Sequence, residues 1–250
     1  MADEYLFVSD CHLHVSRPEV SSALIDFLQR RAARAGHLYI LGDLFEVWLG
    51  DDDPLDELVP VIDSLRAVAE HCEVYFMAGN RDFLLGEEFA RRVGMTLLAE
   101  PELLQLADHS ILLMHGDTLC TDDLDYQAFR KVVRDLDWQS EFLAKPLLQR
   151  QQIARQLRSD SADASAQKAM DIMDVASEAV ANCFREHRVD SIIHGHTHRP
   201  AVHHYQADLT RYVLGDWDPG PSFLSWSPGR DFELVDSRVN VSQGTSVRAL

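Results

Sequence analysis

Short apolar runs recur along the chain, and each ends in a polar turn. Five runs have the aliphatic and aromatic content of buried strands. Each ends in a turn that carries Asp, Asn or His, and four of the five turns also contain a glycine. The runs cover residues 5–9, 38–41, 74–77, 111–114 and 192–193. This repetition predicts an α/β protein whose polar residues gather at the carboxyl ends of its strands.

Segments with helical spacing separate these strands. Residues 18–35 begin with a proline and residues 54–71 follow an acidic run, as helix starts often do. We interpret that acidic run, Asp51 to Asp53, as a solvated cap for the second helix in preference to metal ligands. Three later apolar runs predict strands of a second sheet that closes a sandwich: 212–214, 223–226 and 232–235.

Residues 123–187 read as helical, without a strand pattern. We therefore expect a core formed by residues 1–122 and 188–250, interrupted by a helical insertion that forms a lid. The last residues, 237–250, read as a loose tail.

The insertion carries an apolar stripe beside basic residues, which give residues 129–158 a local net charge of +4. Two interpretations stay open. The stripe packs against the core, which is the commoner case, or it is a cationic amphipathic lid that meets lipid. Its members are Phe129, Val132, Val133, Leu136, Trp138, Phe142, Leu143, Leu147 and Leu148.

Composition narrows the class of protein. With 250 residues, 46% of them hydrophobic, the chain can bury the core of one large domain. It contains neither an apolar run long enough to span a bilayer nor a secretory signal pattern, so we expect a cytoplasmic protein. A formal charge of −18 argues against nucleic acid as a partner. The four scattered cysteines fit reduced core thiols better than disulfides.

The polar turns together offer ligands for divalent metal ions. Carboxylate and amide oxygens mixed with imidazoles suit Mn²⁺, Fe²⁺ or Zn²⁺ better than Ca²⁺ or Mg²⁺, and their number exceeds the need of one ion. Asp10 and His12 alternate in a segment that we expect to be extended, so both can face one ion. His194, His196 and His198 also alternate, and we expect all three imidazoles to point at one spot.

Taken in order, five motifs resemble those of the calcineurin-like metallophosphoesterases: Asp10-x-His12, Gly42-Asp43, Gly79-Asn80, His115 and Gly195-His196-x-His198. The resemblance implies an αββα fold, a β-sandwich flanked by helices. It also implies two divalent ions per chain, with Mn²⁺ favoured. One ion would be held by Asp10, His12 and His198, the other by Asn80, His115 and His196, and Asp43 would bridge them.

Arg81 stands where the wider superfamily usually has a histidine that protonates the leaving group. Arginine does not release a proton near neutral pH, but it can clamp a phosphate oxygen with two N–H groups. An enzyme with this residue should prefer a bond whose leaving group needs no proton, such as a pyrophosphate.

Longer strings, at 42–48, 79–84, 115–123 and 194–200, resemble one family within this group, the UDP-2,3-diacylglucosamine pyrophosphohydrolases of lipid A biosynthesis. That resemblance implies that metal-activated water attacks the α-phosphorus, giving UMP and 2,3-diacylglucosamine 1-phosphate. Cys11 departs from the leucine usual at its position. The implied catalytic residues are Asn80, Arg81 and His196, and the implied substrate contacts are Asn80, Arg81, Asp123, Ser161, Ser165, Lys168 and His196.

The implied substrate is a glycolipid of the inner membrane. We therefore expect peripheral attachment to the cytoplasmic face of that membrane, through the insertion, and no obligate protein partner. Two alternatives remain. The first is a dinuclear-metal phosphohydrolase acting on soluble nucleotide-sugars, dinucleotides or phosphodiesters. The second is a scaffold that keeps the fold for protein binding, which the complete set of seven ligand positions disfavours.

Overall fold

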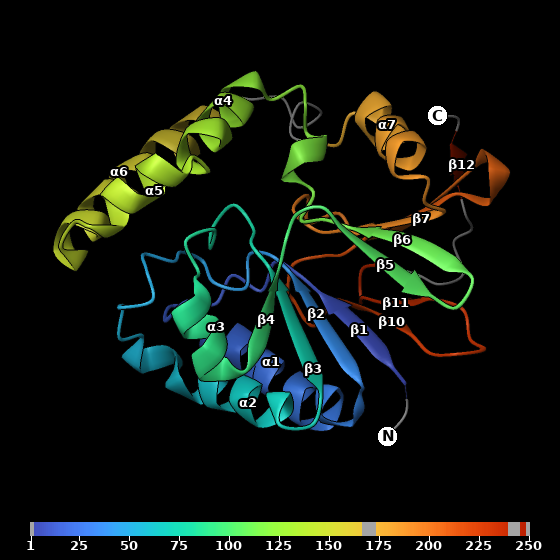
Figure 1. Cartoon of the computed structure of the whole chain (residues 1–250), viewed down its shortest axis with the longest axis horizontal. Coiled ribbons are helices and arrows are strands. Elements are labelled where there is room, and N and C mark those ends of the chain that lie inside the picture. The colour runs from blue at the N-terminus through green and yellow to red at the C-terminus, as the bar shows by residue number, and fades with distance from the viewer. Residues whose placement is uncertain (1–2, 167–173, 240–245, 249–250) are drawn as a thin grey trace.

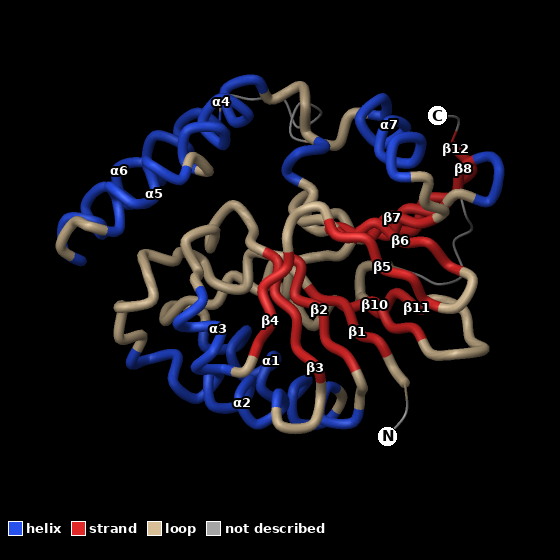
Figure 2. Tube along the Cα trace, in the orientation of Figure 1, coloured by secondary structure: helices blue, strands red, loops and turns tan. Residues whose placement is uncertain are grey.

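The computed structural model of the protein describes residues 3–166, 174–239 and 246–248. Two six-stranded sheets face each other, with helices on their outer faces (Figure 1; Figure 2). The first sheet has the order β11-β10-β1-β2-β3-β4, and β1 to β4 are parallel to one another. Its strands are β1 (Tyr5–Val8), β2 (His37–Leu41), β3 (Glu73–Met77), β4 (Met95–Leu98), β10 (Phe223–Trp226) and β11 (Glu233–Val235).

The second sheet has the order β12-β8-β9-β7-β6-β5, with β6, β7 and β9 parallel. Its strands are β5 (Glu102–Leu106), β6 (His109–Leu113), β7 (Ser191–His194), β8 (Ala201–Tyr205), β9 (Thr210–Val213) and β12 (Ser246–Arg248).

Helices cover the outer face of each sheet, and three more stand apart from the sandwich. On the first sheet lie α1 (Pro18–Arg30), α2 (Val59–Ala69) and α3 (Glu87–Val93). On the second lies α7 (Ser177–His187), whose Val180 and Phe184 pack against Leu112 and Ile192. Short 3-10 turns occupy Ala32–Arg34, Asp56–Leu58, Asp117–Leu119 and Gln206–Asp208. The predicted αββα arrangement is confirmed.

Alternation along the strands explains this layering. In β1, Leu6 and Val8 point toward the helical layer and Phe7 points into the space between the sheets. Successive side chains of a strand face opposite sides, and a parallel strand covered on both sides is apolar throughout. Each large apolar side chain buried in this way stabilises the fold by about 1.5–3 kcal/mol.

Between β6 and β7 the chain leaves the sandwich and forms α4 (Leu124–Val133), α5 (Leu136–Leu143) and α6 (Leu147–Ala166). These outer helices lie over the loops at the carboxyl ends of the strands (Figure 1). Among the described residues, none of the helices has both the length and the apolar character needed to span a bilayer.

Three features of the fold differ from the sequence-based expectation. Of the three late runs expected in the second sheet, only the first joins it, as β9, whereas β10 and β11 extend the first sheet because β10 pairs with β1. The expected loose tail contains β12, which pairs in parallel with β8, so part of it completes the second sheet. The apolar pattern also missed β4, β5, β8 and α3. In β5, for example, Leu103 is 58% exposed, because an edge strand needs only one apolar face.

Candidate metal centre and adjoining pocket

The five predicted polar turns meet at one edge of the sandwich. Main-chain hydrogen bonds join them, from Asp10 N to the Gly42 carbonyl (3.0 Å) and from Gly195 N to the His115 carbonyl (2.8 Å). The carboxyl ends of neighbouring parallel strands lie at the same edge of a sheet, so side chains far apart in sequence converge there.

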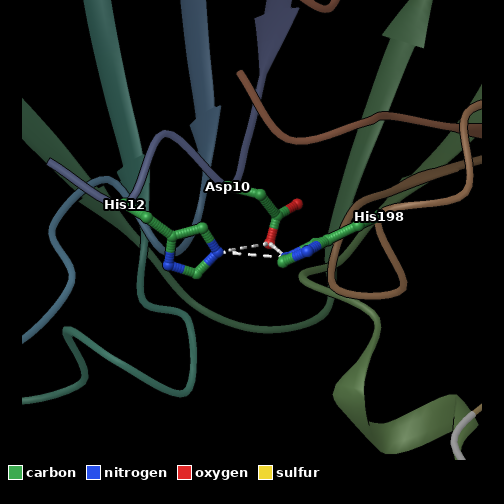
Figure 3. Close-up of side chains that lie close together, drawn as sticks. All are labelled: Asp10, His12 and His198. Carbon is green, nitrogen blue, oxygen red and sulfur yellow. Dashed lines mark hydrogen bonds and ion pairs between the residues drawn. The ribbon is translucent and has the colours of Figure 1, made fainter. Parts of the chain in front are cut away.

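Asp10, His12 and His198 form the first cluster (Figure 3). The Nε2 atoms of the two imidazoles lie 3.0 Å apart, and His198 Nε2 lies 3.3 Å from Asp10 Oδ1. A neutral imidazole offers a lone pair at one ring nitrogen, so two such atoms beside a carboxylate suit a shared cation. On its far side, His12 Nδ1 faces Glu46 Oε2 at 3.0 Å, an outer contact typical of metal-binding histidines.

Asn80, His115 and His196 form the second cluster. Asn80 Oδ1 lies 2.9 Å from His115 Nε2 and 2.8 Å from His196 Nδ1. His115 Nδ1 faces the Leu41 carbonyl at 2.9 Å, so that nitrogen carries the ring proton of the neutral form. His115 Nε2 and Asn80 Oδ1 are then two acceptors facing each other, an arrangement that needs a proton or a cation between them. The donor atoms therefore fit a divalent ion.

Asp43 lies between the two clusters and is buried. Its Oδ2 is 3.9 Å from His12 Nε2, and its Oδ1 is 3.8 Å from His115 Nε2. One carboxylate thus turns an oxygen toward each cluster, as a bridging ligand must. All seven predicted ligand positions are brought together by the fold.

The backbone bends unusually at these positions. Asp10, His12, Asp43, His196 and His198 all have left-handed φ angles, between 48° and 68°. Such conformations cost roughly 1–3 kcal/mol each and concentrate at functional sites. The expectation of an extended Asp10-x-His12 segment is therefore wrong, because β1 ends at Val8 and each of the two residues turns the chain separately.

Two glycines make the crowding possible. A Cβ on Gly79 would collide with the Asp43 carboxylate, and a Cβ on Gly195 would collide with Asp10 and Ser9. Glycine is required at both positions because another chain segment approaches the backbone too closely for a side chain.

The electrostatics of the cluster favour a cation. Burial opposes ionisation of Asp10, but His198 first, then His115 and His12, outweigh it and lower the pKa of Asp10. Burial likewise disfavours a charged His115, but the Asp43 and Asp10 carboxylates raise its pKa to about 9. Burial, followed by the His115 charge, lowers the pKa of His196 to about 4. A bound divalent ion would replace the imidazolium proton and neutralise the same carboxylates.

His194 and the acidic run play other roles than expected. His194 points away from both clusters, because its Nδ1 faces the Gly195 carbonyl (2.9 Å) and its Nε2 contacts Arg211 (2.9 Å). Only two of the three alternating imidazoles therefore reach the site. Asp51 accepts hydrogen bonds from Gly86 N and Phe89 N at the start of α3, so it caps that helix instead of α2.

Two residues that support the clusters were missed at the sequence level. Asp82, fully buried, accepts hydrogen bonds from the backbone of Gly79 (2.9 Å), Asp43 (3.2 Å) and Phe45 (3.3 Å). Glu46 contacts His12 as described above. Both lie inside the motif strings, but their roles depend on contacts made only in the fold.

A cavity of about 380 Å³ opens beside the clusters, between the strand-end loops and the outer helices. Of the predicted substrate contacts, it is lined by Asn80, Arg81, Asp123 and His196. The side chains of Ser161 and Ser165, on α6, and the whole of Lys168 lie outside the described part of the chain. Six aromatic side chains also line it: Trp48, Phe83, Tyr126, Phe129, Trp138 and Phe142.

The apolar stripe of the outer helices has two faces. Phe142 is buried against the pocket, with its ring stacked on Trp138 at 5.1 Å. Val132, Leu136 and Leu148 instead point outward and are between 54% and 79% exposed. The packing interpretation therefore holds for one face of the stripe, and the other face is exposed.

The basic residues of the same segment were expected to supply free positive charge. Three of them are instead engaged within the protein. Arg130 pairs with Asp117 and Glu100, and Arg134 donates to the carbonyls of Ala78 (3.2 Å) and Gly79 (2.9 Å). Arg150, only 2% exposed, pairs with Asp52. These arginines hold the outer helices against the core. The local net charge of the segment therefore overstates the positive charge that a ligand can contact.

The sequence profile of the calcineurin-like phosphoesterases matches residues 4–200. The chain belongs to the calcineurin-like phosphoesterase family. Within the family, it is 49% identical to a Chromohalobacter salexigens protein, over 86% of this chain and 89% of that one. It is 50% identical to an Aromatoleum aromaticum protein (88% and 92% covered) and 47% identical to one from Klebsiella pneumoniae (92% and 97%). All three are named UDP-2,3-diacylglucosamine hydrolase, which confirms the predicted resemblance.

Proposed function

We propose that the protein hydrolyses the pyrophosphate bond of UDP-2,3-diacylglucosamine, giving UMP and 2,3-diacylglucosamine 1-phosphate for lipid A biosynthesis. One observation carries the proposal. Both ligand clusters contribute residues to a pocket that is also lined by Arg81 and by many aromatic and aliphatic side chains. A phosphate-processing centre beside an apolar chamber suits an anionic glycolipid. The name shared by the close relatives supports the same substrate.

In this proposal, Asp10, His12 and His198 hold one divalent ion and Asn80, His115 and His196 hold the other, with Asp43 bridging. This mixture of oxygen and nitrogen ligands suits Mn²⁺, Fe²⁺ or Zn²⁺, and of these we propose Mn²⁺, the ion that the family resemblance favours. Bound there, the ions would polarise phosphoryl oxygens and lower the pKa of a water molecule for in-line attack.

The chain's own residues orient the substrate. Arg81 lines the pocket and is 39% exposed, and its Nε atom has no hydrogen-bond partner in the part of the chain that the structure describes. Its nearest carboxylate, Glu46, is 3.8 Å away. A guanidinium so weakly engaged is ready to donate hydrogen bonds to two phosphoryl oxygens. Asp123 is held by Tyr126 N (3.0 Å), so its carboxylate has a fixed position at the pocket wall.

We assign the acyl chains to the aromatic half of the pocket. This half is closed by Trp138, Phe142 and Leu157, which lie on the outer helices. In this proposal the outer helices form a lid over the metal centre. The division into a core (1–122 and 188–250) and a helical insertion (123–187) remains a proposal. The departure of the chain between β6 and β7 supports it, although α7 at the end of the insertion packs on the second sheet. Ser161, Ser165 and Lys168 remain proposed substrate contacts of the insertion.

Peripheral attachment to the cytoplasmic face of the inner membrane is part of this proposal. The outward face of the outer helices carries Leu124 (75% exposed), Leu136 (79%) and Leu148 (63%). Large apolar side chains exposed near basic residues suit the surface of an anionic bilayer, from which the substrate must be drawn. No obligate protein partner is proposed.

Initial rates on two substrates test the proposal. With Mn²⁺ present, UDP-2,3-diacylglucosamine should be converted to UMP. UDP-N-acetylglucosamine, which carries only an acetyl group at position 2 and a free hydroxyl at position 3, should be left intact. The Asp43→Asn variant should lose the activity because it weakens the bridge between the two ions. Hydrolysis of the soluble nucleotide-sugar with no turnover of the lipid would refute the substrate assignment and favour the alternative phosphohydrolase.

A further inference from the structure

We infer that Arg130 and Glu100 are positioning residues for the metal position of Asn80, His115 and His196. The inference rests on the proposed dinuclear centre and adds a support that neither the motifs nor the names of the relatives assign. Arg130 lies on α4, and Glu100 lies between β4 and β5. Neither residue lines the pocket.

Glu100 acts directly on the backbone of a ligand. Its Oε1 accepts a hydrogen bond from His115 N at 2.8 Å, and its side chain is only 9% exposed. His115 is thereby held at both ends, through its main chain by Glu100 and through its Nδ1 by the Leu41 carbonyl. The direction of the imidazole depends on both contacts.

Arg130 holds Glu100 and a second carboxylate at once. Its Nη2 donates to Glu100 Oε2 at 2.9 Å, and its Nε donates to Asp117 Oδ2 at 2.8 Å. Asp117, two residues after His115, is fully buried and also accepts from the Tyr126 hydroxyl at 2.5 Å. One guanidinium therefore clamps the main chain on both sides of the ligand.

Charge explains why an arginine is needed here. Two nearly buried carboxylates close together are unfavourable unless a cation pairs with both. A planar guanidinium offers donors in the fixed fork that this bridge uses, and an ammonium group does not. Without Arg130, Glu100 and Asp117 would repel each other and turn toward water, and the His115 segment would shift with them.

The support is one-sided. The network contacts the second cluster directly at His115, whose backbone N–H donates to Glu100. The loop that carries both His196 and His198 lies one hydrogen bond further away, through Gly195 N and the His115 carbonyl. In the described part of the chain, neither Arg130 nor Glu100 pairs with a residue of the first cluster, where His12 is supported by Glu46 and Asp10 by the Ser9 hydroxyl. Loss of the network should consequently weaken one ion much more than the other.

Calorimetric titration of the full-length, metal-free protein with Mn²⁺ tests the inference. Wild type should bind two ions. Arg130→Met should bind one of them 10- to 100-fold more weakly, the loss typical of removing an outer support of a metal ligand, and the other within about threefold. Lys131→Met, which removes an exposed charge one residue further along α4, should match wild type at both positions.

Glu100→Gln provides a second variant that preserves side-chain shape. Its amide oxygen can still accept from His115 N, but its NH₂ group faces a donor of Arg130, so the same single ion should be weakened. Circular dichroism of each metal-free variant reports its folding. Unchanged affinities in Glu100→Gln, or equal weakening of both ions in a folded variant, would overturn the inference while leaving the proposed function intact. A wild type that binds fewer than two ions would overturn both.

Discussion

The role of Arg81 separates this account from that of a general phosphoesterase. The structure leaves its guanidinium at the mouth of the metal centre, 3.8 Å from Glu46 and without a tight ion pair. Its backbone N–H donates to Asp43 Oδ1 at 2.8 Å, a contact that any substitution except proline retains. Side-chain variants therefore test the guanidinium without removing the support of Asp43.

The expected magnitude follows from the lost contacts. A hydrogen bond to a charged group contributes about 1.5–3 kcal/mol. Arg81→Lys retains a positive charge but gives up one of two donors, so kcat/KM should fall roughly 10- to 150-fold. Arg81→Met gives up both donors, and the loss should reach about 10² to 10⁴-fold.

The assay is UMP release from UDP-2,3-diacylglucosamine, with Arg155→Met on the outer helices as the control that removes a positive charge from another part of the chain. Simple alkyl phosphomonoesters, whose leaving group needs a proton, should be poor substrates for wild type. Full activity in Arg81→Lys, or rapid turnover of alkyl phosphomonoesters, would refute the reasoning.

Three further outcomes are expected. Removing metal with EDTA should lower Tm. Mn²⁺ at one hundred times its dissociation constant stabilises the folded protein by about 2.7 kcal/mol, which corresponds to about 5 to 11 °C in Tm for a chain of this size. An unchanged Tm would exclude tight binding. Gly195→Ala should abolish binding at one or both metal positions, because the new Cβ collides with Asp10 and Ser9. Titration calorimetry checks this, and a variant that still binds two ions would contradict it. Leu136→Asp combined with Leu148→Asp should reduce sedimentation with anionic vesicles, whereas Leu103→Asp, at a leucine that is 58% exposed on β5, should leave it unchanged.

The positions of the site residues at the ends of strands could be predicted from the sequence. Asp10, Asp43, Asn80, His115 and His196 all follow buried strands, and the side-by-side packing of those strands brings them together whatever the details of each turn. The backbone conformation within each turn could not be predicted. The left-handed angles at Asp10 and His12 arise from crowding between loops, which no local pattern records.

The contacts that support the metal ligands from distant parts of the chain could not be predicted from the sequence either. Arg130 and Glu100 are 30 positions apart and meet only because α4 folds back over the strand ends. Counting charges placed Arg130, Arg134 and Arg150 in a free basic patch, but charge in a folded chain depends on the partners that folding supplies. His194 illustrates the same limit, since its ring contacts Arg211, which lies 17 positions later in the chain.

The most direct test of the central claim is the fate of oxygen in the reaction. Purified protein with Mn²⁺ would be incubated with UDP-2,3-diacylglucosamine in H₂¹⁸O, and both products analysed by mass spectrometry. The account predicts one ¹⁸O atom in UMP and none in 2,3-diacylglucosamine 1-phosphate, because water attacks the α-phosphorus. Label in the sugar phosphate, or no cleavage of the lipid at all, would contradict it.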